Sequence, residues 1–107
     1  MKKEMFDKIV EEQFGICKNI LIDRANSYSA EEDRLANFKR GAKYRNTTPE
    51  DFGWGLVTKQ LVALEMYIEK LRDNEERPDM KLVTEWVTDI MNYCMLIKAL
   101  MLERISN

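Results

Sequence analysis

An apolar stripe between Trp54 and Leu71 constrains the fold of this 107-residue chain more than any other feature. Its members recur at intervals of three and four residues, which is the spacing of one face of an α-helix. They are Trp54, Val57, Leu61, Leu64, Ile68 and Leu71. We expect this helix to begin at Thr48, because Pro49 suits the first helical position, and to end before the charged turn at residues 73–79.

Two more segments carry long helical patterns. The first runs from about Lys3 to Asp23, and the second from about Met80 to Ile105. The apolar residues of the first form one stripe at helical spacing, which consists of Phe6, Val10, Phe14, Cys17 and Leu21. Both segments are therefore predicted to be helices with an apolar face.

A shorter helix is predicted to open at Ser29. The Ser29 hydroxyl can cap the helix while Glu32, three residues later, completes a capping box. We expect this helix to bury Leu35 and Phe38. The four helices together predict an all-α fold, a four-helix bundle-like single domain over residues 1–107.

The last helix is unusual because eleven of the thirteen residues from Ile90 to Leu102 are apolar. A helix that is apolar all round must be covered on every side, and three short neighbours leave little to cover it. We therefore expect self-association into a homo-oligomer, unless the first helix and the following loop cover this helix within one chain.

The composition limits the catalytic mechanisms, metal ligands and cell compartments that suit this chain. The chain has no histidine, which removes His-based acid–base catalysis and the commonest transition-metal ligand. Cys17 and Cys94 lie in apolar helical patterns without a close partner, so we expect two reduced core thiols. The N-terminus lacks the apolar segment of a signal peptide, and the longest apolar run, Tyr93–Ile97, is too short to span a bilayer. We expect a cytoplasmic protein without a membrane partner.

The segment of residues 34–45 carries five basic side chains and no acidic one, although the formal net charge of the chain is −2. Such a local cationic patch on an acidic chain favours an anion of modest size. A long nucleic acid would meet the acidic remainder, and no nucleic-acid-binding motif is present. The alternative is that this segment is the solvated face of its helix.

Two charges interrupt apolar rows on the long helices. Lys59 lies in the row of the third predicted helix, and Asp89 lies in the row of the fourth, with Asn92 at the next turn. An unpaired buried charge would cost several kcal/mol, roughly, so each needs a partner. Either Lys59 and Asp89 pair with each other or reach solvent, or they line a polar pocket between helices that receives a ligand.

Several short motifs resemble small helical proteins encoded by phages and prophages, the nucleotide-modification-associated helical domain family. The motifs are Arg24-Ala-Asn26-Ser-Tyr28, Asp33-Arg-Leu35-Ala-Asn37-Phe38-Lys39, Lys59 in its apolar helix, and Asp89-Ile-Met-Asn92-Tyr93. The resemblance implies a phage-related role in handling nucleotides. The resemblance and the basic segment together give these candidate ligand-binding residues: Arg24, Asn26, Tyr28, Arg34, Asn37, Phe38, Lys39, Arg40, Lys59, Asp89, Asn92 and Tyr93.

A second resemblance is to the all-α nucleoside triphosphate pyrophosphohydrolases similar to MazG, which hold magnesium with ExxE and ExxD acid pairs on two helices. This chain departs from that pattern, because its acids are four residues apart. They are Glu65, Glu69, Glu85 and Asp89. Four residues is workable for two ligands on one helix face, and it is also a common spacing of surface acids.

Three hypotheses follow for the function. The first is a nucleotide-binding protein, not an enzyme and without a cofactor, that sequesters a small phosphorylated nucleotide such as a host immune signal in the host cytoplasm. The second is a Mg²⁺-dependent MazG-like pyrophosphohydrolase. The third is a helical protein-interaction module without a small ligand. The first is preferred, because the chain combines a cationic patch, aromatic residues and a possible pocket, yet lacks histidine and a matching acid motif.

Overall fold

The computed structural model describes residues 1–27 and 33–106, with the backbone alone for residues 24–27. This part of the chain forms four α-helices and no strand: α1 (Lys3–Ser27), α2 (Ala36–Arg45), α3 (Pro49–Asn74) and α4 (Met80–Ile105). The predicted all-α fold is therefore confirmed. The bounds predicted for α3 and α4 agree with the structure to within two residues at each end, and α1 continues four residues beyond Asp23.

Local capping explains where the two longest helices begin. Pro49 occupies the start of α3, and the Thr48 hydroxyl accepts a hydrogen bond of 3.1 Å from the Asp51 amide. At the start of α4, the Asp79 carboxylate accepts hydrogen bonds from the amides of Lys81 and Leu82. Each cap pairs backbone donors that the first helical turn leaves without partners.

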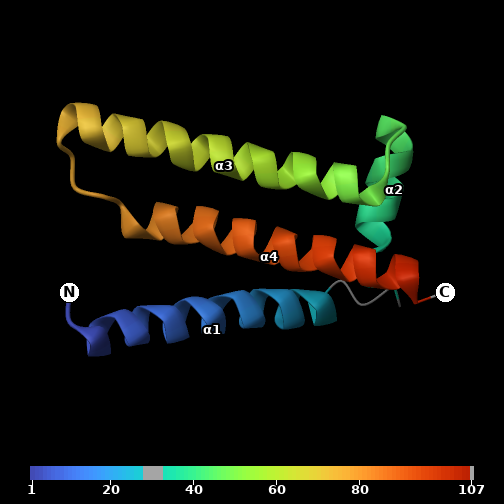
Figure 1. Ribbon diagram of the computed structural model, residues 1–107, viewed down its shortest axis with the longest axis horizontal. Coiled ribbons are helices and arrows are strands. Elements are labelled where there is room, and N and C mark those ends of the chain that lie inside the picture. Colours follow the sequence, from blue (N-terminus) through green and yellow to red (C-terminus); the bar gives the residue numbers. More distant parts are fainter. Residues whose placement is uncertain (28–32, 107) are drawn as a thin grey trace.

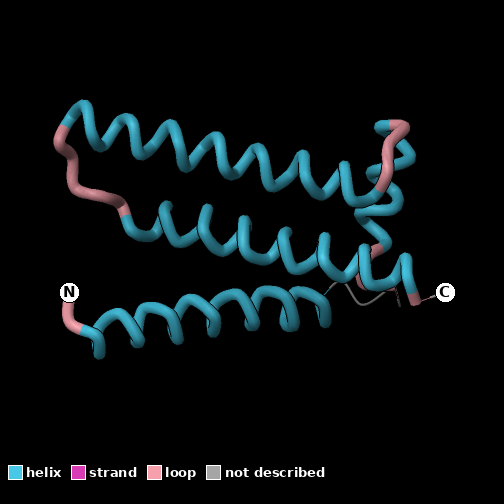
Figure 2. Tube along the Cα trace, viewed as in Figure 1, coloured by secondary structure: helices cyan, strands magenta, loops and turns pink. Residues whose placement is uncertain are grey.

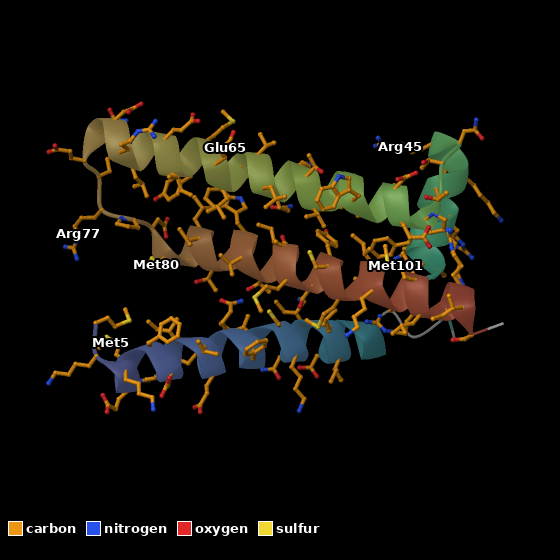
Figure 3. The ribbon with its side chains drawn as sticks, viewed as in Figure 1. Met5, Arg45, Glu65, Arg77, Met80 and Met101 are labelled. Carbon is orange, nitrogen blue, oxygen red and sulfur yellow. The ribbon has the colours of Figure 1, made fainter. Side chains whose placement is uncertain are left out.

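The three long helices lie in one layer, with α4 between α3 and α1 (Figure 1). Helix α3 runs antiparallel to α4, while α1 and α4 begin at the same end, where Met5 and Met80 are labelled (Figure 3). The short α2 crosses the opposite end and packs against α3 (Figure 2). In the described part of the chain, α1 packs against α4 and against no other helix.

This open layer is less compact than a closed bundle. Its radius of gyration is 16.4 Å, against about 13 Å for a compact domain of 100 residues. Its principal extents are 48 × 30 × 26 Å, so the molecule is elongated along the helices. Both broad faces of α4 therefore lack a covering long helix among the described residues.

The hydrophobic core lies where α2 meets α3 and α4. Leu35, Phe38 and Leu100 are its buried members, and Phe52 and Tyr93 pack around them. The Phe38 ring makes edge-on contacts with both aromatic neighbours, at centroid distances of 6.1 and 6.4 Å. The predicted burial of Leu35 and Phe38 is confirmed.

The predicted start of the second helix is wrong in its described part. Residues 33–35 form a turn, and α2 begins at Ala36. The Asp33 carboxylate accepts a hydrogen bond of 2.9 Å from the Leu35 amide, and this local bond competes with helix formation. Ser29 and Glu32, the proposed capping box, lie outside the described residues.

The predicted core position is confirmed for Cys17, which is buried, and wrong for Cys94, which is exposed; both thiols are free. Cys17 is also the only buried member of the apolar stripe of α1, and Phe6 and Phe14 are exposed to 57% and 58%. Helix α1 contacts α4 and no other described helix, so most of its side chains stay exposed. Among the described residues, no helix combines the length and the apolar character that crossing a bilayer requires.

Candidate functional site

Two adjoining hollows lie between α1 and α4, and we call them together the α1–α4 groove. The smaller hollow has a volume of about 140 Å³ and is lined by Ile20, Leu21, Arg34, Asp89, Asn92, Tyr93 and Leu96. The larger has a volume of about 290 Å³ and is lined by Ile16, Ile20, Thr84, Glu85, Thr88 and Asp89. Ile20 and Asp89 line both hollows, so the two hollows adjoin.

Asn92 is the most unusual residue of the groove. Its side chain is 95% buried, at 5% relative exposure. Neither its Nδ2 nor its Oδ1 has a hydrogen-bond partner in the described part of the protein. An unsatisfied buried polar group costs about 1–3 kcal/mol, so native proteins rarely keep one without a reason. Asn92 is thus a buried residue beside the smaller hollow, with a donor and an acceptor that no described residue satisfies.

Polar contacts hold the walls of the groove in place. The Gln13 amide of α1 donates a hydrogen bond of 2.8 Å to the Thr88 hydroxyl of α4. The Arg34 guanidinium donates a hydrogen bond of 2.7 Å to the carbonyl of Leu21. The first bond ties α1 to α4, and the second holds Arg34, the one cation among the described side chains that line the groove.

The structure brings four of the predicted ligand-binding residues together. Arg34, Asp89, Asn92 and Tyr93 all line the smaller hollow. Asp89, Asn92 and Tyr93 are within one turn of α4, so their proximity follows from helical spacing. Arg34 is distant in sequence and reaches the hollow because the turn at residues 33–35 lies beside the C-terminal half of α1.

The structure does not place Lys59 in this group. Lys59 is exposed on α3 and lines a separate hollow of about 440 Å³ with Arg45, Asp51 and other residues. Since Lys59 is two residues after the buried Val57, it lies more than half a turn away from the buried side of α3. The predicted pairing with Asp89, and the pocket floor shared with it, are therefore wrong.

Two further candidates have structural partners. Phe38 is a core residue with 7% exposure, so its ring packs against protein. Lys39 lies between two carboxylates, with its Nζ 2.6 Å from Asp33 Oδ2 and 2.6 Å from Glu103 Oε1. The hydrogen bond from Lys39 lowers the pKa of Asp33, and the hydrogen bonds to Asp33 and Glu103 raise the pKa of Lys39.

The basic segment does not form one wall of a site. Arg40 and Lys43 line a hollow of about 510 Å³ with Tyr44, whereas Lys39 pairs with Asp33 and Glu103. Asn37 is exposed on α2. Arg24 and Asn26 lie in the last turns of α1, where only the backbone is described, and Tyr28 lies outside the described residues.

No family model, no curated protein and no solved structure matches this chain.

The acids of the alternative magnesium site do not converge. Glu65 and Glu69 are exposed on α3, where Glu65 is labelled in Figure 3, whereas Glu85 and Asp89 lie on the side of α4 that faces α1. Within the described ranges, no group of three or more acidic, cysteine or histidine side chains is placed to hold a metal ion. The spacing of four residues therefore brings the two acids of each helix together, but it does not bring the two pairs together.

Sequence reasoning missed the α1 side of the groove and its threonines. Ile16, Ile20 and Leu21 supply the apolar wall, and no polar signal marked them. Thr84 and Thr88 precede Asn92 at intervals of four residues, so the three polar side chains form one row on α4. That polar row was the available signal, because residues four apart share one face of a helix.

Proposed function

We propose that this protein binds a small phosphorylated nucleotide in the α1–α4 groove and holds it without turnover. The observation that carries the proposal is the buried carboxamide of Asn92, whose two polar atoms have no partner in the described part of the chain. A carboxamide offers a donor beside an acceptor, and nucleobase edges offer the complementary pair. A base in the smaller hollow would offset the cost of burying Asn92.

The lining of the groove supports the placement of the other parts of a nucleotide. Ile20, Tyr93 and Leu96 give the smaller hollow apolar walls beside Asn92, which suits a planar base. Arg34 suits a phosphate, because its guanidinium offers a fork of donors. Glu85 lines the larger hollow and Asp89 lines both, and their carboxylates can accept hydrogen bonds from sugar hydroxyls.

Binding without turnover is preferred to the MazG-like reaction. The chain has no histidine. The two acid pairs of the alternative do not face each other, because Glu65 and Glu69 are exposed on α3, whereas Glu85 and Asp89 lie on the side of α4 that faces α1. The phage-encoded setting, the host cytoplasm and a host immune signal as the ligand are parts of the proposal that rest on the family resemblance alone.

The test exploits opposite effects of one substitution. Asn92→Leu removes both unpaired polar atoms at nearly constant volume, so the ligand-free protein should unfold at a higher temperature, by the equivalent of about 1–3 kcal/mol. The same variant should lose the thermal stabilisation that a bound nucleotide gives the wild type. The measurement is a thermal-shift screen of nucleotides, together with mass spectrometry of small molecules released by heating the purified protein.

Asn19→Leu is the matched control, because Asn19 is exposed on α1 and lines neither hollow. It should leave nucleotide stabilisation unchanged. If Asn92→Leu binds nucleotides as the wild type does, the groove is not the site. Release of pyrophosphate from a nucleoside triphosphate in the presence of Mg²⁺ would replace the proposal with the hydrolase.

The second candidate function is a helical protein-interaction module. It is favoured by the number of large apolar side chains that the described residues leave exposed on all three long helices. Under this alternative the nucleotide screen is flat, and heating releases no nucleotide.

A further inference from the structure

Helix α3 carries two rows of apolar residues, each with a spacing of seven residues, and only one row is buried among the described residues. Val57, Leu64 and Leu71 are seven residues apart and are buried or half-buried toward α4. Trp54, Leu61 and Ile68 alternate with them at the same spacing, and they remain 57%, 40% and 55% exposed. In a seam of this spacing both rows normally pack against a neighbouring helix. The outer row of α3 therefore lacks its partner within the described part of the chain.

The outer row lies on the face of the layer opposite the α1–α4 groove. Phe52 and Leu56 mark the groove side of α3, because they pack on the same cluster as Tyr93 and Leu96. Trp54 and Leu61 are two and nine residues from Phe52, which places them about half a turn away. The two sides of α3 are thus distinct, and the outer row is on the back of the layer.

The other long helices continue this back surface. On α4, Cys94 and Met101 are two and nine residues from Asn92, so they lie about half a turn from the groove, and Met101 is labelled near the C-terminal end of α4 in Figure 3. On α1, Phe14 is 58% exposed and lies about half a turn from Ile16, which lines only the larger hollow. We call this surface the apolar face. It consists of Phe14, Trp54, Leu61, Ile68, Cys94 and Met101.

The size of the apolar face matches that of a stable interface. Six large or apolar side chains, each about half exposed, offer on the order of 500 Å², because a fully buried aromatic side chain contributes about 150–250 Å². A standard interface buries about 800 Å² on each partner, of which roughly 60% is apolar. The apolar face alone supplies that share.

We infer that a second copy of this chain covers the apolar face, with the two three-helix layers stacked back to back. A single partner helix fills one inter-helix furrow, but the apolar side chains extend over α1, α4 and α3 together. A second copy presents the same three helices, so it has the extent to cover all of these side chains at once. Two-fold symmetry is the commonest symmetry of soluble oligomers, and it places the apolar face of one copy against the same face of the other. The net charge of −2 opposes this association only weakly.

This arrangement leaves the α1–α4 groove open on the outer side of each layer. It also explains how α4 can be apolar on nearly every side, since α1 and α3 flank it and the second copy covers its back. The inference does not depend on the nucleotide proposal.

The test is the mass of the full chain in solution, measured by light scattering after size exclusion. The wild type should have at least twice the monomer mass of 12.7 kDa, and Leu61→Glu should have the monomer mass. Met66→Glu is the matched control, because Met66 is 62% exposed on the same helix but lies half a turn from the buried Val57, away from α4. It should keep the wild-type mass. A monomeric wild type, or an oligomeric Leu61→Glu, overturns the inference.

A second measurement applies to the unaltered sequence. Cys94 lies on the apolar face, whereas Cys17 is buried inside the chain. Alkylation of Cys94 by a maleimide should be several-fold slower in a concentrated sample than in a dilute one, because association covers the thiol. Equal rates at both concentrations would show that another surface carries any self-association.

Discussion

The two sides of α4 are packed in different ways. On the side of α3 and α2, the buried residues Leu35, Phe38 and Leu100 form a continuous core with aromatic edge contacts. On the side of α1, Cys17 is the one buried apolar side chain among the described residues, and the buried Thr88 and Asn92 are polar. The contacts include a glutamine–threonine hydrogen bond and a 3.9 Å contact from the Cys17 thiol to the sulfur of Met91. Most of the hydrophobic stabilisation of the chain therefore lies on one side of α4.

The two sides of α4 therefore have different roles. The α2–α3–α4 side carries the hydrophobic core, while α1 contacts only α4 among the described helices and forms one wall of the candidate groove. Regions with few buried apolar contacts open most easily. A ligand that bridges α1 and α4 would then stabilise α1 more than any other helix, by simple linkage.

The largest expected effect comes from removing an aromatic ring on the packed side. Phe38→Ala should destabilise the protein by about 3–5 kcal/mol, because it leaves a cavity among Phe52, Tyr93 and Leu100. Phe14→Ala, on α1, should change the free energy of unfolding by no more than about 0.5 kcal/mol in dilute solution, because Phe14 is mostly exposed. Urea denaturation of both variants measures the contrast.

Equal losses for the two phenylalanines would contradict the comparison. A loss for Phe14→Ala that grows with protein concentration would sharpen it, because a second copy then covers that ring.

A smaller effect, with opposite signs on the two sides, is expected from glycine-to-alanine substitutions. A Cβ at Gly53 would lie 2.9 Å from atoms of both Ile97 and Phe38, so overpacking should exceed the gain in helix propensity and cost about 1 kcal/mol net. A Cβ at Gly15 meets nothing within 4 Å, and Gly15→Ala should stabilise α1 by about 1 kcal/mol.

Gly55→Ala controls for the helix itself, because Gly55 is on α3 with Gly53 but also meets nothing within 4 Å. Thermal unfolding should rank the three variants with Gly53→Ala lowest. If Gly53→Ala is as stable as Gly55→Ala, the close contact of α3 with α4 and α2 is looser than described.

The smallest effect concerns the ion pairs at the edge of the core. The pKa of Asp33 is lowered, so its contribution to stability is present above the ordinary carboxyl pKa and is lost as the pH falls through the lowered value. The pKa of Lys39 is raised, so its contribution is present below the ordinary lysine pKa and is lost as the pH rises through the raised value. Stability should therefore fall below about pH 4 and above about pH 10.5.

Lys39→Met should flatten both limbs of this pH profile, measured as the urea midpoint at a series of pH values. The change should be slight, because these side chains are 35–44% exposed and surface pairs contribute little. Lys43→Met, on the same helix, should leave the profile as it is in the wild type. A Lys39→Met profile identical to the wild type would mean that solvent screens the pairs completely.

Local signals predicted the helices well, and tertiary contacts account for the failures. The starts of α3 and α4 follow from the capping chemistry of Thr48 and Asp79, which acts within one turn of the chain. The start of α2 could not be predicted in the same way, because the Asp33 carboxylate competes for the Leu35 amide and forms a turn.

The candidate site was predicted only in part. Asp89, Asn92 and Tyr93 could be grouped from the sequence, because one turn of one helix joins them. Lys59 and the α1 wall could not be placed, because their positions depend on the rotation of α3 and α1 about their own axes. That rotation is decided by which apolar residues face α4, and both helices offer more than one apolar side.

The sequence by itself therefore determined the helical fold, most helix ends, the burial of Leu35 and Phe38, and the grouping of Asp89, Asn92 and Tyr93 on α4, because short-range spacing and capping carry that information. Only the tertiary structure decided that α1 packs on α4 alone, that the basic residues are dispersed, and that Asn92 is buried without a partner in the described part of the chain. Those outcomes depend on how helices with several apolar sides share the burial of their surfaces, which no periodicity within a single helix specifies.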